Sequence, residues 1–266
     1  GVAVLAKCFN TDLMVVDVGV NAEINHPGVI NRKIRRSTSN IAKGPAMSRE
    51  EAVTAMLTGI EMAGEARRKG YGIIGVGEMG IGNTTTSSAV LCSLTGIDAD
   101  LTVGKGAGLS KEGYEKKKKI IKNAIRIHKP DPKDPIDVIS KVGGFDIAAM
   151  TGVYIGAAYY RLPVVIDGFI SAVSALAAAR LAGPAVEYMI PSHKSCEPGY
   201  VYTVRELGLE PALALDMRLG EGSGCPLMFM VVDAACAIIR DMATFAEAAI
   251  DDKYLENIKG EDSFDR

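Results

Sequence analysis

The sequence is poor in cysteine, and its few cysteines follow no pattern. The chain of 266 residues has an odd number of them, none spaced as C-x-x-C: Cys8, Cys92, Cys196, Cys225 and Cys236. This argues against a disulfide framework and favours buried free thiols in a reducing compartment, the cytoplasm. His193 lies three residues before Cys196, but two ligand types do not make a zinc site, so we expect no metal.

Net charge and long apolar runs are also lacking. The formal net charge is −2, which gives no indication of a nucleic-acid partner. A membrane helix needs about 20 apolar residues, and the longest candidate, residues 169–183, is interrupted by Arg180. The first residues, "GVAVLAKCFN", carry no initiator methionine and no signal-peptide flank, so we expect a chain separated from an earlier segment.

Apolar runs and helical patterns alternate along the chain. Nearly continuous apolar runs predict buried strands, and they lie at 13–20, 71–77, 162–168 and 186–193. Helices are expected at about 49–69 (opened by a Ser48–Glu51 capping box), 85–96, 109–129, 135–144, 146–161 and 225–245. This alternation predicts an α/β fold, a Rossmann-like parallel sheet covered by helices on both faces.

The chain reads as one α/β domain over residues 1–250 and a polar tail over 251–266, expected to be frayed. Within the domain, the lysine run 116–119 predicts a solvated helix face. The last helix, 225–245, is apolar enough to predict a largely buried element.

Residues 75–88, "GVGEMGIGNTTTSS", crowd glycines at the end of a predicted strand. Residues 75–80 match the dinucleotide pattern G-x-G-x-x-G, but a second turn intervenes before the next helix can begin. Residues 77–84 match the spacing of a triphosphate loop, except that Asn83 replaces its lysine, which disfavours an ATPase. A nicotinamide-dependent oxidoreductase therefore remains an alternative that rests on "GVGEMG" alone.

The segment "GIGNTT" fits a site for one phosphate group rather than for a dinucleotide or a triphosphate. Backbone amides from Gly80 through Gly82 to Asn83, the hydroxyls of Thr84 and Thr85, and a helix N-terminus suit a single phosphate monoester. A tight strand-to-helix turn without a ligand is the alternative.

Three carboxylates lie beside glycines. Glu221, in "GEGSG", has little steric cover and is able to take a proton from a ring N–H, or else it caps the helix near Pro226. Asp167 directly follows a predicted strand, which favours a place in a site wall. Asp146 follows Gly144 by two residues and is expected to be a helix N-cap.

Several long motifs together resemble one enzyme family. They are "GEMGIGNTT" (77–85), "KVGGFDIAAM" (141–150), "PVVIDGFIS" (163–171), "IPSHKSCEPG" (190–199) and "LEPALALDMRLGEGSG" (209–224). In this order they are similar to the nicotinate-nucleotide:dimethylbenzimidazole phosphoribosyltransferases of cobamide lower-loop assembly. The resemblance implies a homodimer and a parallel α/β sheet with a small helical second domain. It also implies transfer of phosphoribose from nicotinate mononucleotide to a benzimidazole nitrogen, giving α-ribazole 5′-phosphate and nicotinate.

The resemblance also implies roles for individual residues. It makes Glu221 the catalytic base and Glu78 a second functionally sensitive acid. It assigns the phosphate to "GIGNTT" and Lys117, and it brings Ser195, Leu219 and Gly220 near the bases. Nicotinate leaves as a neutral molecule from a cationic pyridinium, so no general acid, metal or cofactor is expected.

The family has a further N-terminal segment that carries polar residues of the benzimidazole pocket, and this chain begins after it. Base selectivity therefore stays open, and a phenolic or purine-like acceptor is the alternative within the same chemistry.

Overall fold

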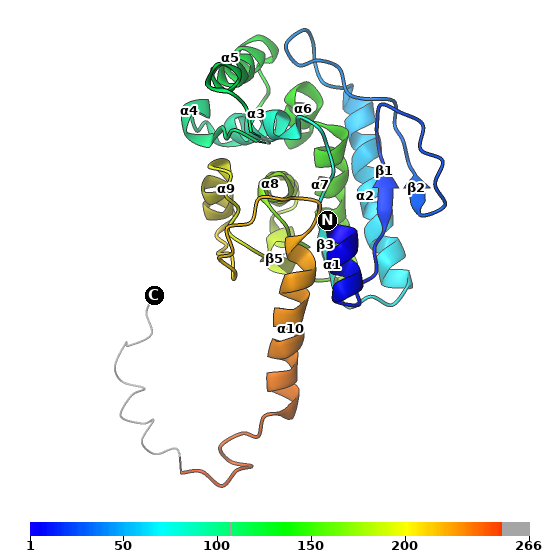
Figure 1. The fold of residues 1–266 in the computed structure, drawn as a ribbon, viewed down its shortest axis with the longest axis vertical. Coiled ribbons are helices and arrows are strands. Elements are labelled where there is room, and N and C mark those ends of the chain that lie inside the picture. The colour runs from blue at the N-terminus through cyan, green and yellow to red at the C-terminus, as the bar shows by residue number, and fades with distance from the viewer. Residues whose placement is uncertain (107, 252–266) are drawn as a thin grey trace. The chain divides into compact units, whose positions relative to one another are not determined.

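Short parallel strands position the ends of much longer helices. The structure is a computed structural model that describes residues 1–106 and 108–251. Its contacts divide the chain into two units, Gly1–Phe229 and Met230–Arg266, which are described separately (Figure 1). In chain order the elements are α1 (Val2–Cys8), β1 (Val15–Asp17), β2 (Val29–Asn31), α2 (Arg49–Arg68), β3 (Ile74–Val76), α3 (Asn83–Thr95), α4 (Ala99–Thr102), α5 (Lys111–His128), α6 (Pro135–Val142), α7 (Phe145–Tyr159), β4 (Val164–Ile166), α8 (Phe169–Leu181), the 3-10 helix η1 (Gly183–Tyr188), β5 (Met189–Pro191), α9 (Gly199–Leu207) and α10 (Gly224–Asp241).

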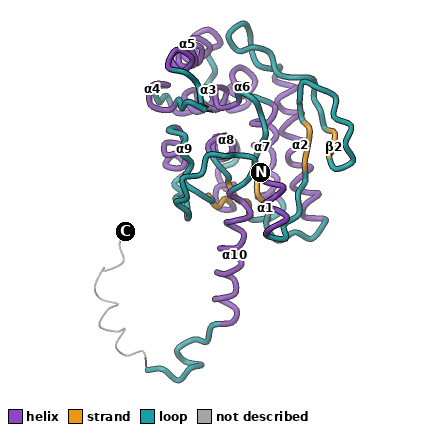
Figure 2. The backbone as a smooth tube through the Cα atoms, in the orientation of Figure 1, coloured by secondary structure: helices purple, strands orange, loops and turns teal. Residues whose placement is uncertain are grey.

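The described strands form two parallel sheets. A three-stranded sheet has the order β3-β4-β5, with Val164 of β4 paired with Ile74 on one side and Met189 on the other. All three residues of β4 are buried, as the sequence predicts for a strand covered on both faces. Figure 2 shows how short these strands are beside the helices that surround them. The predicted parallel α/β fold is confirmed.

The prediction for residues 13–20 is wrong in two respects. β1 covers only Val15–Asp17 and pairs with β2 in a separate two-stranded sheet, where the sequence analysis placed no strand. Leu13 is 45% and Val15 is 42% exposed, so this run is not buried on both faces. A β-branched apolar run indicates extended backbone, but burial on two faces also requires two covering layers.

Glycines let α2 and α7 pack backbone to backbone. The capping box at Ser48 is present and α2 begins at Arg49, as predicted. Gly59 of α2 lies against the carbonyl of Ala149, and Gly152 of α7 against the carbonyl of Met56; a Cβ at either glycine would overlap that oxygen. Close approach of the two axes is therefore encoded by residues without side chains.

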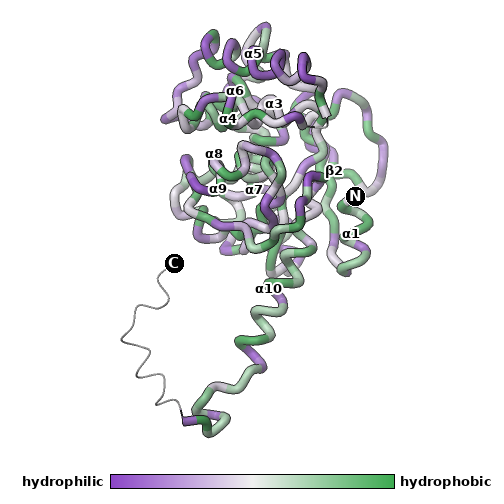
Figure 3. Tube along the Cα trace, turned by 60° about the vertical axis from the view of Figure 1, so that its left-hand side comes forward, coloured by the Kyte–Doolittle hydropathy of each residue, from purple (hydrophilic) through white to green (hydrophobic). Residues whose placement is uncertain are grey.

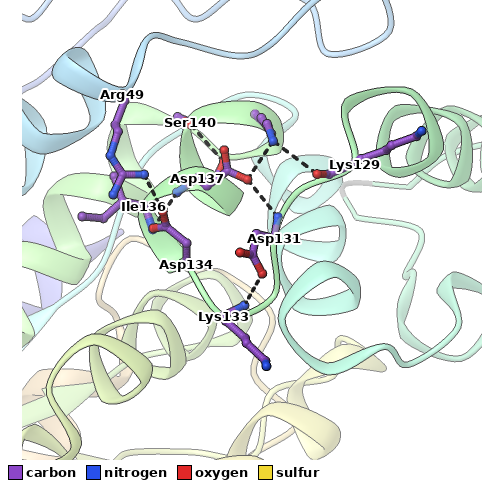
Figure 4. A network of polar contacts seen from close by, with 9 residues as sticks. Arg49, Lys129, Asp131, Lys133, Asp134, Ile136, Asp137 and Ser140 are labelled. Carbon is purple, nitrogen blue, oxygen red and sulfur yellow. Dashed lines mark hydrogen bonds and ion pairs between the residues drawn. The ribbon is translucent and has the colours of Figure 1, made fainter.

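A network of charges connects the starts of α2 and α6 (Figure 4). Asp134 caps α6 by accepting hydrogen bonds from the backbone N–H of Ile136 and Asp137, both at 3.1 Å. Arg49, the first residue of α2, binds its Oδ2 at 2.6 Å and, as the largest cause, lowers the pKa of Asp134. The predicted helices 135–144 and 146–161 are confirmed in outline, with Gly143 and Gly144 between them.

The lysine run in α5 is not uniformly solvated. Hydrophilic and hydrophobic stretches alternate along this helix (Figure 3), and Lys116 and Lys119 are exposed as predicted. Lys117 is only 5% exposed, so the prediction of a solvated face is wrong for this residue. Helical periodicity turns one lysine of a consecutive run inward. The run alone does not indicate whether hydrogen-bond acceptors for its ammonium lie there.

The last helix also departs from its prediction. In α10 the buried residues are Gly224, Cys225, Pro226 and Met228. The part that belongs to the second unit is largely exposed, with Met230 at 50% and Ile239 at 86%, so the prediction of a largely buried helix is wrong. Apolar composition predicts that a surface is buried only where a partner surface is available to cover it.

Two smaller predictions have mixed outcomes. Of the free cysteines, Cys92 and Cys225 are buried, but Cys8, Cys196 and Cys236 are exposed. Among the described helices, none is long and apolar enough to cross a membrane. The predicted polar tail lies outside the described residues from 252 onward, and the domain boundary at 250 stays a prediction.

Candidate active site

Three loops converge where the strands of the larger sheet end. Because β3, β4 and β5 are parallel, the residues that follow them lie at one edge: the glycine loop from Gly77, Asp167, and the segment Ser192–Ser195. This is the edge at which open α/β sheets bind ligands.

The glycine loop delivers a helix N-terminus to this edge. Gly82 is the N-cap of α3 with φ 81°, a left-handed conformation that glycine adopts without strain, and the helix begins at Asn83. A dinucleotide fingerprint requires the helix to begin inside the motif, whereas α3 begins three residues after Gly80. Thr84 and Thr85 occupy the first turn of α3, where the helix dipole and backbone N–H groups favour an anion.

Lys117 reaches this N-terminus from α5. Its ammonium donates to Thr84 Oγ1 at 2.8 Å and to the carbonyl of Gly104 at 3.0 Å. Burial lowers the pKa of Lys117, while the nearby Glu197 carboxylate acts in the opposite direction. The structure therefore brings together two residues, Thr84 and Lys117, that lie 33 positions apart in the sequence.

Glu197 is a site-edge residue that the sequence analysis missed. Burial raises the pKa of its carboxyl, and the charge of Lys117 partly offsets this effect. Its backbone N–H donates to Ser195 Oγ at 3.4 Å, which connects the predicted Ser195 to the Lys117 region. Ser195 itself is 8% exposed. The signal available in the sequence was an acid between Cys196 and Pro198, in the segment that follows β5.

A second group of side chains is acidic. The Asn83 amide donates to the carboxylates of both Glu78 and Asp146, at 2.7 Å in the case of Asp146 Oδ2. Asp146 is therefore not the predicted N-cap: Gly144 caps α7, and Asp146 lies two residues further on, in the first turn. Its carboxylate faces the β3–α3 loop, a contact between segments far apart in sequence that no local pattern reveals.

Glu78 has an unusual protonation equilibrium. Burial raises the pKa of Glu78 to about 7, the hydrogen bond from Asn83 lowers it, and the charges of Asp146 and Asp167 raise it further. Near neutral pH this carboxyl therefore exists in both protonation states, which is a common property of groups in functional sites.

Glu221 is placed on a turn beside Glu78. Its backbone N–H donates to the carbonyl of Glu78 at 3.1 Å. Its side chain is 21% exposed, and its Oε2 accepts from the Val2 N–H at 3.0 Å. The carboxylate thus faces the start of α1. The alternative was that Glu221 caps the last helix, but it does not cap α10, which begins at Gly224.

The remaining predicted residues adjoin this turn. Gly220 has φ 78°, and a Cβ there would lie 3.5 Å from Glu78 Oε1. Leu219 is 57% exposed. Asp167 is 2% exposed, and its carboxylate accepts from the backbone N–H of Gly222 at 2.9 Å and of Gly224 at 2.8 Å. Within the described ranges no group of three or more His, Cys, Asp or Glu side chains has the arrangement of a metal site.

The raised pKa of Glu78 has a consequence for stability. The ordinary value is 4.5 and the folded value about 7, so between these pH values the folded state holds a proton that the unfolded state has lost. The stability from this proton is complete below about pH 4.5 and is lost as pH rises through about 7. As pH rises across this window, we expect the free energy of unfolding of Glu78→Gln to increase relative to that of wild type by up to about 3 kcal/mol. Urea unfolding at a series of pH values measures the difference.

Glu61, whose side chain is 64% exposed on α2, offers a matched control. The difference between Glu61→Gln and wild type should stay nearly constant over the same pH range. Parallel curves for wild type and Glu78→Gln would contradict the assignment of this proton.

Comparisons with known proteins agree with this geometry. Residues 1–250 match the phosphoribosyltransferase family DBI_PRT. A Clostridium perfringens protein described as nicotinate-nucleotide–dimethylbenzimidazole phosphoribosyltransferase is 56% identical over 264 residues, which cover 99% of this chain and 73% of that protein. A Ruminiclostridium cellulolyticum protein with the same description is 57% identical over 251 residues, covering 94% and 71%.

A solved structure gives the same result for the fold. The crystal structure of CobT from Thermus thermophilus has a TM-score of 0.88 and 38% identity, covering 93% of this chain and 74% of that one. Sequence and fold therefore agree over nearly the whole chain, and the chain belongs to the nicotinate-nucleotide–dimethylbenzimidazole phosphoribosyltransferase family.

Proposed function

We propose that this chain transfers phosphoribose from nicotinate mononucleotide to 5,6-dimethylbenzimidazole or a related base. The products are α-ribazole 5′-phosphate and nicotinate, in the assembly of the cobalamin nucleotide loop. The observation that carries the proposal is the buried ammonium of Lys117 on Thr84 at the N-terminus of α3, within reach of an acidic group at the same sheet edge. The free thiols fit a cytoplasmic enzyme.

Lys117 and the first turn of α3 form the phosphate anchor in this proposal. An anion there gains from the helix dipole, the backbone N–H groups of the Gly80–Asn83 turn, the hydroxyls of Thr84 and Thr85, and the ammonium. The ammonium is partly desolvated already, so a phosphate meets a charge that has little water to give up. Anchoring one end of the nucleotide fixes the position of its anomeric carbon.

Glu221 is the base in this proposal. A benzimidazole attacks the anomeric carbon through one ring nitrogen while the other carries hydrogen, and positive charge spreads over the ring as the bond forms. A carboxylate that accepts this N–H stabilises the transition state more than the ground state. Since Oε2 already accepts from the Val2 N–H, we assign the ring N–H to Oε1. Nicotinate leaves with the electrons of the broken glycosidic bond and needs no proton.

The exposed part of α10 supports a homodimer. Apolar side chains on its described turns are open to solvent, among them Met230 at 50%, Ile238 at 54% and Ile239 at 86%. An amphipathic helix with this much exposed apolar surface is typical of a subunit interface, and the covering surface we propose is a second copy of this chain.

A substitution at the phosphate anchor tests the first assignment. Lys117→Met keeps the aliphatic stem and removes the charge, so KM for nicotinate mononucleotide should rise by about 10- to 100-fold, the value of one or two charge-assisted hydrogen bonds. Lys116→Met, its exposed neighbour in α5, should leave KM unchanged. Thr84→Val combined with Thr85→Val should act in the same direction as Lys117→Met. Equal binding of nicotinate riboside and mononucleotide to wild type would refute the anchor.

The proposed base is tested by product formation. Wild type incubated with nicotinate mononucleotide and a panel of benzimidazole, phenolic and purine-like bases should release nicotinate and form a ribotide, separable by chromatography. Glu221→Gln keeps the shape and removes the basicity, so turnover with benzimidazoles should fall by about 10²-fold or more with mononucleotide binding almost unchanged. Near-normal turnover would transfer the role to Glu78. Thermal stabilisation by NAD and not by the mononucleotide would favour an oxidoreductase instead.

The dimer is tested on α10. Ile239→Glu places a charge on a side chain that is 86% exposed, so the monomer should keep its stability while the dimer dissociates. Light scattering at micromolar concentration should therefore give a dimer for wild type and a monomer for the variant. Arg240→Glu, at a neighbouring exposed position, serves as a control for the change of charge. Wild type found as a monomer would contradict this proposal.

A further inference from the structure

The turn that carries Glu221 has an unusual backbone. Gly220, Glu221 and Gly222 have φ of 78°, 62° and 81°, three left-handed residues in succession. The glycines adopt this conformation freely, but for Glu221 it costs about 1 kcal/mol or more. Such a residue keeps its conformation only where surrounding contacts hold it there.

Asp167 provides such contacts on one side of the turn. Its Oδ2 accepts from the N–H of Gly222, the residue after Glu221, at 2.9 Å, and its Oδ1 accepts from the N–H of Gly224 at 2.8 Å. Since Asp167 directly follows the buried strand β4, the carboxylate is fixed to the sheet and is only 2% exposed. Each of its oxygens therefore holds one backbone N–H of a segment more than fifty residues away in sequence.

Ser192 and His193 lie next to Asp167. The hydroxyl of Ser192 donates to the backbone carbonyl of Asp167 at 3.3 Å, so it accepts from His193 Nδ1–H at 2.9 Å. That ring nitrogen lies 3.9 Å from Asp167 Oδ1. Gly224 packs directly on the imidazole, where a Cβ would overlap Nδ1.

The glycine loop closes the other side of the turn. A Cβ at Gly77 would overlap the backbone N of Gly222, so these two segments of the chain touch through backbone atoms alone. The N–H of Glu221 donates to the carbonyl of Glu78 at 3.1 Å. Asp167 and Gly77 therefore hold the backbone of the turn from two sides.

We infer that Asp167 is the positioning residue of the catalytic base: its carboxylate holds the backbone after Glu221 and so fixes where the Glu221 side chain leaves the turn. This inference rests on the proposed role of Glu221 as the base. Asp167 is 2% exposed and its oxygens bind Gly222 and Gly224, so it acts through Glu221 and not on the substrate.

Asp167→Asn is the nearest isosteric change. A carboxamide offers one oxygen to one N–H and turns an NH₂ toward the other, so one of the two contacts is lost. A base displaced by an ångström reduces turnover strongly, and we expect kcat to fall by about 10- to 100-fold with KM for nicotinate mononucleotide within about twofold.

Asp17 offers a matched control. It ends β1 and is 4% exposed; its Oδ1 accepts from the N–H of Gly19 at 3.0 Å and of Val20 at 2.9 Å, and its Oδ2 pairs with Lys33 at 2.7 Å. Its turn carries no proposed catalytic group. Asp17→Asn should lower the melting temperature as Asp167→Asn does and leave kcat within about twofold. Equal losses of kcat in the two variants would overturn the inference.

A double-mutant cycle separates positioning from other roles. In the Glu221→Gln background the basic group is already gone, so Asp167→Asn should reduce kcat by less than about threefold further. Full multiplication of the two losses would show that Asp167 acts elsewhere, and would overturn the inference. Full turnover of Glu221→Gln alone would instead refute the proposed base.

Hydrogen exchange tests the hold on the turn without any activity measurement. The amides of Gly222 and Gly224 should exchange at least about tenfold faster in Asp167→Asn and at the wild-type rate in Asp17→Asn. Unchanged exchange would overturn the inference whatever the kinetics. If Asp167→Asn does not fold, Ser192→Ala takes its place, since it removes the hydroxyl that bonds the backbone carbonyl of Asp167 and His193 Nδ1 and keeps the carboxylate. It should lower kcat a few-fold and speed the same two amides, and no change in either would overturn the inference.

Discussion

Charge removed from water at one edge of a three-stranded sheet is the constraint on which the rest of the site depends. Burial raises the pKa values of Glu78, Asp167 and Glu197 and lowers that of Lys117. Glu78, Asp167 and Lys117 are nevertheless hydrogen-bonded, because an unpaired buried charge costs several kcal/mol. Glu197 lies near the opposite charge of Lys117. The glycine turns supply many of the N–H groups, which explains why the loops at this edge are rich in glycine.

This edge has a polarity along the surface. Lys117 and the N-terminus of α3 form a positive end, while Glu78, Asp146 and Glu221 form a negative end, and the consecutive residues Asn83 and Thr84 join the two. Nicotinate mononucleotide has the complementary arrangement, with a phosphate dianion at one end and a cationic pyridinium at the other. The same negative end suits the benzimidazolium that forms on transfer. Electrostatics would thus orient the donor and stabilise the acceptor with a single distribution of charge.

The sequence predicted those parts of the site that local patterns determine. "GIGNTT" predicted a helix N-terminus after a strand, and α3 begins there, while the phosphate assigned to it stays a prediction. "GEGSG" predicted an acid on a glycine turn, and Glu221 lies on one. Contacts between distant segments were not predictable in the same way. Lys117 looked like one solvated lysine among four, and Asp146 looked like a cap, because their partners Thr84 and Asn83 lie 33 and 63 residues away. The resemblance to the family identified Lys117 but gave no account of why a buried ammonium is stable there.

The same limit applies to burial. Residues 13–20 and the helix from 225 are both apolar enough to be interior, yet Val15 and Ile239 are exposed. An apolar pattern indicates that a surface is more stable when covered, but it does not indicate which element or subunit covers it.

The two acids nearest the turn are distinguished by their environments. Glu78 is desolvated and lies near the charges of Asp146 and Asp167, so its pKa of about 7 leaves it protonated part of the time at neutral pH. Glu221 is more exposed, and its Oε2 accepts from the Val2 N–H, so water and a hydrogen bond both favour its ionised form. Two carboxyls in environments this different take different roles. The ionised one is available to accept a proton as soon as the ring becomes cationic, and the partly protonated one is able to donate a hydrogen bond. In the proposed mechanism, placement on a turn held by Asp167 then matters as well as basicity, because a weak base in the correct position receives a proton from an acidic ring N–H.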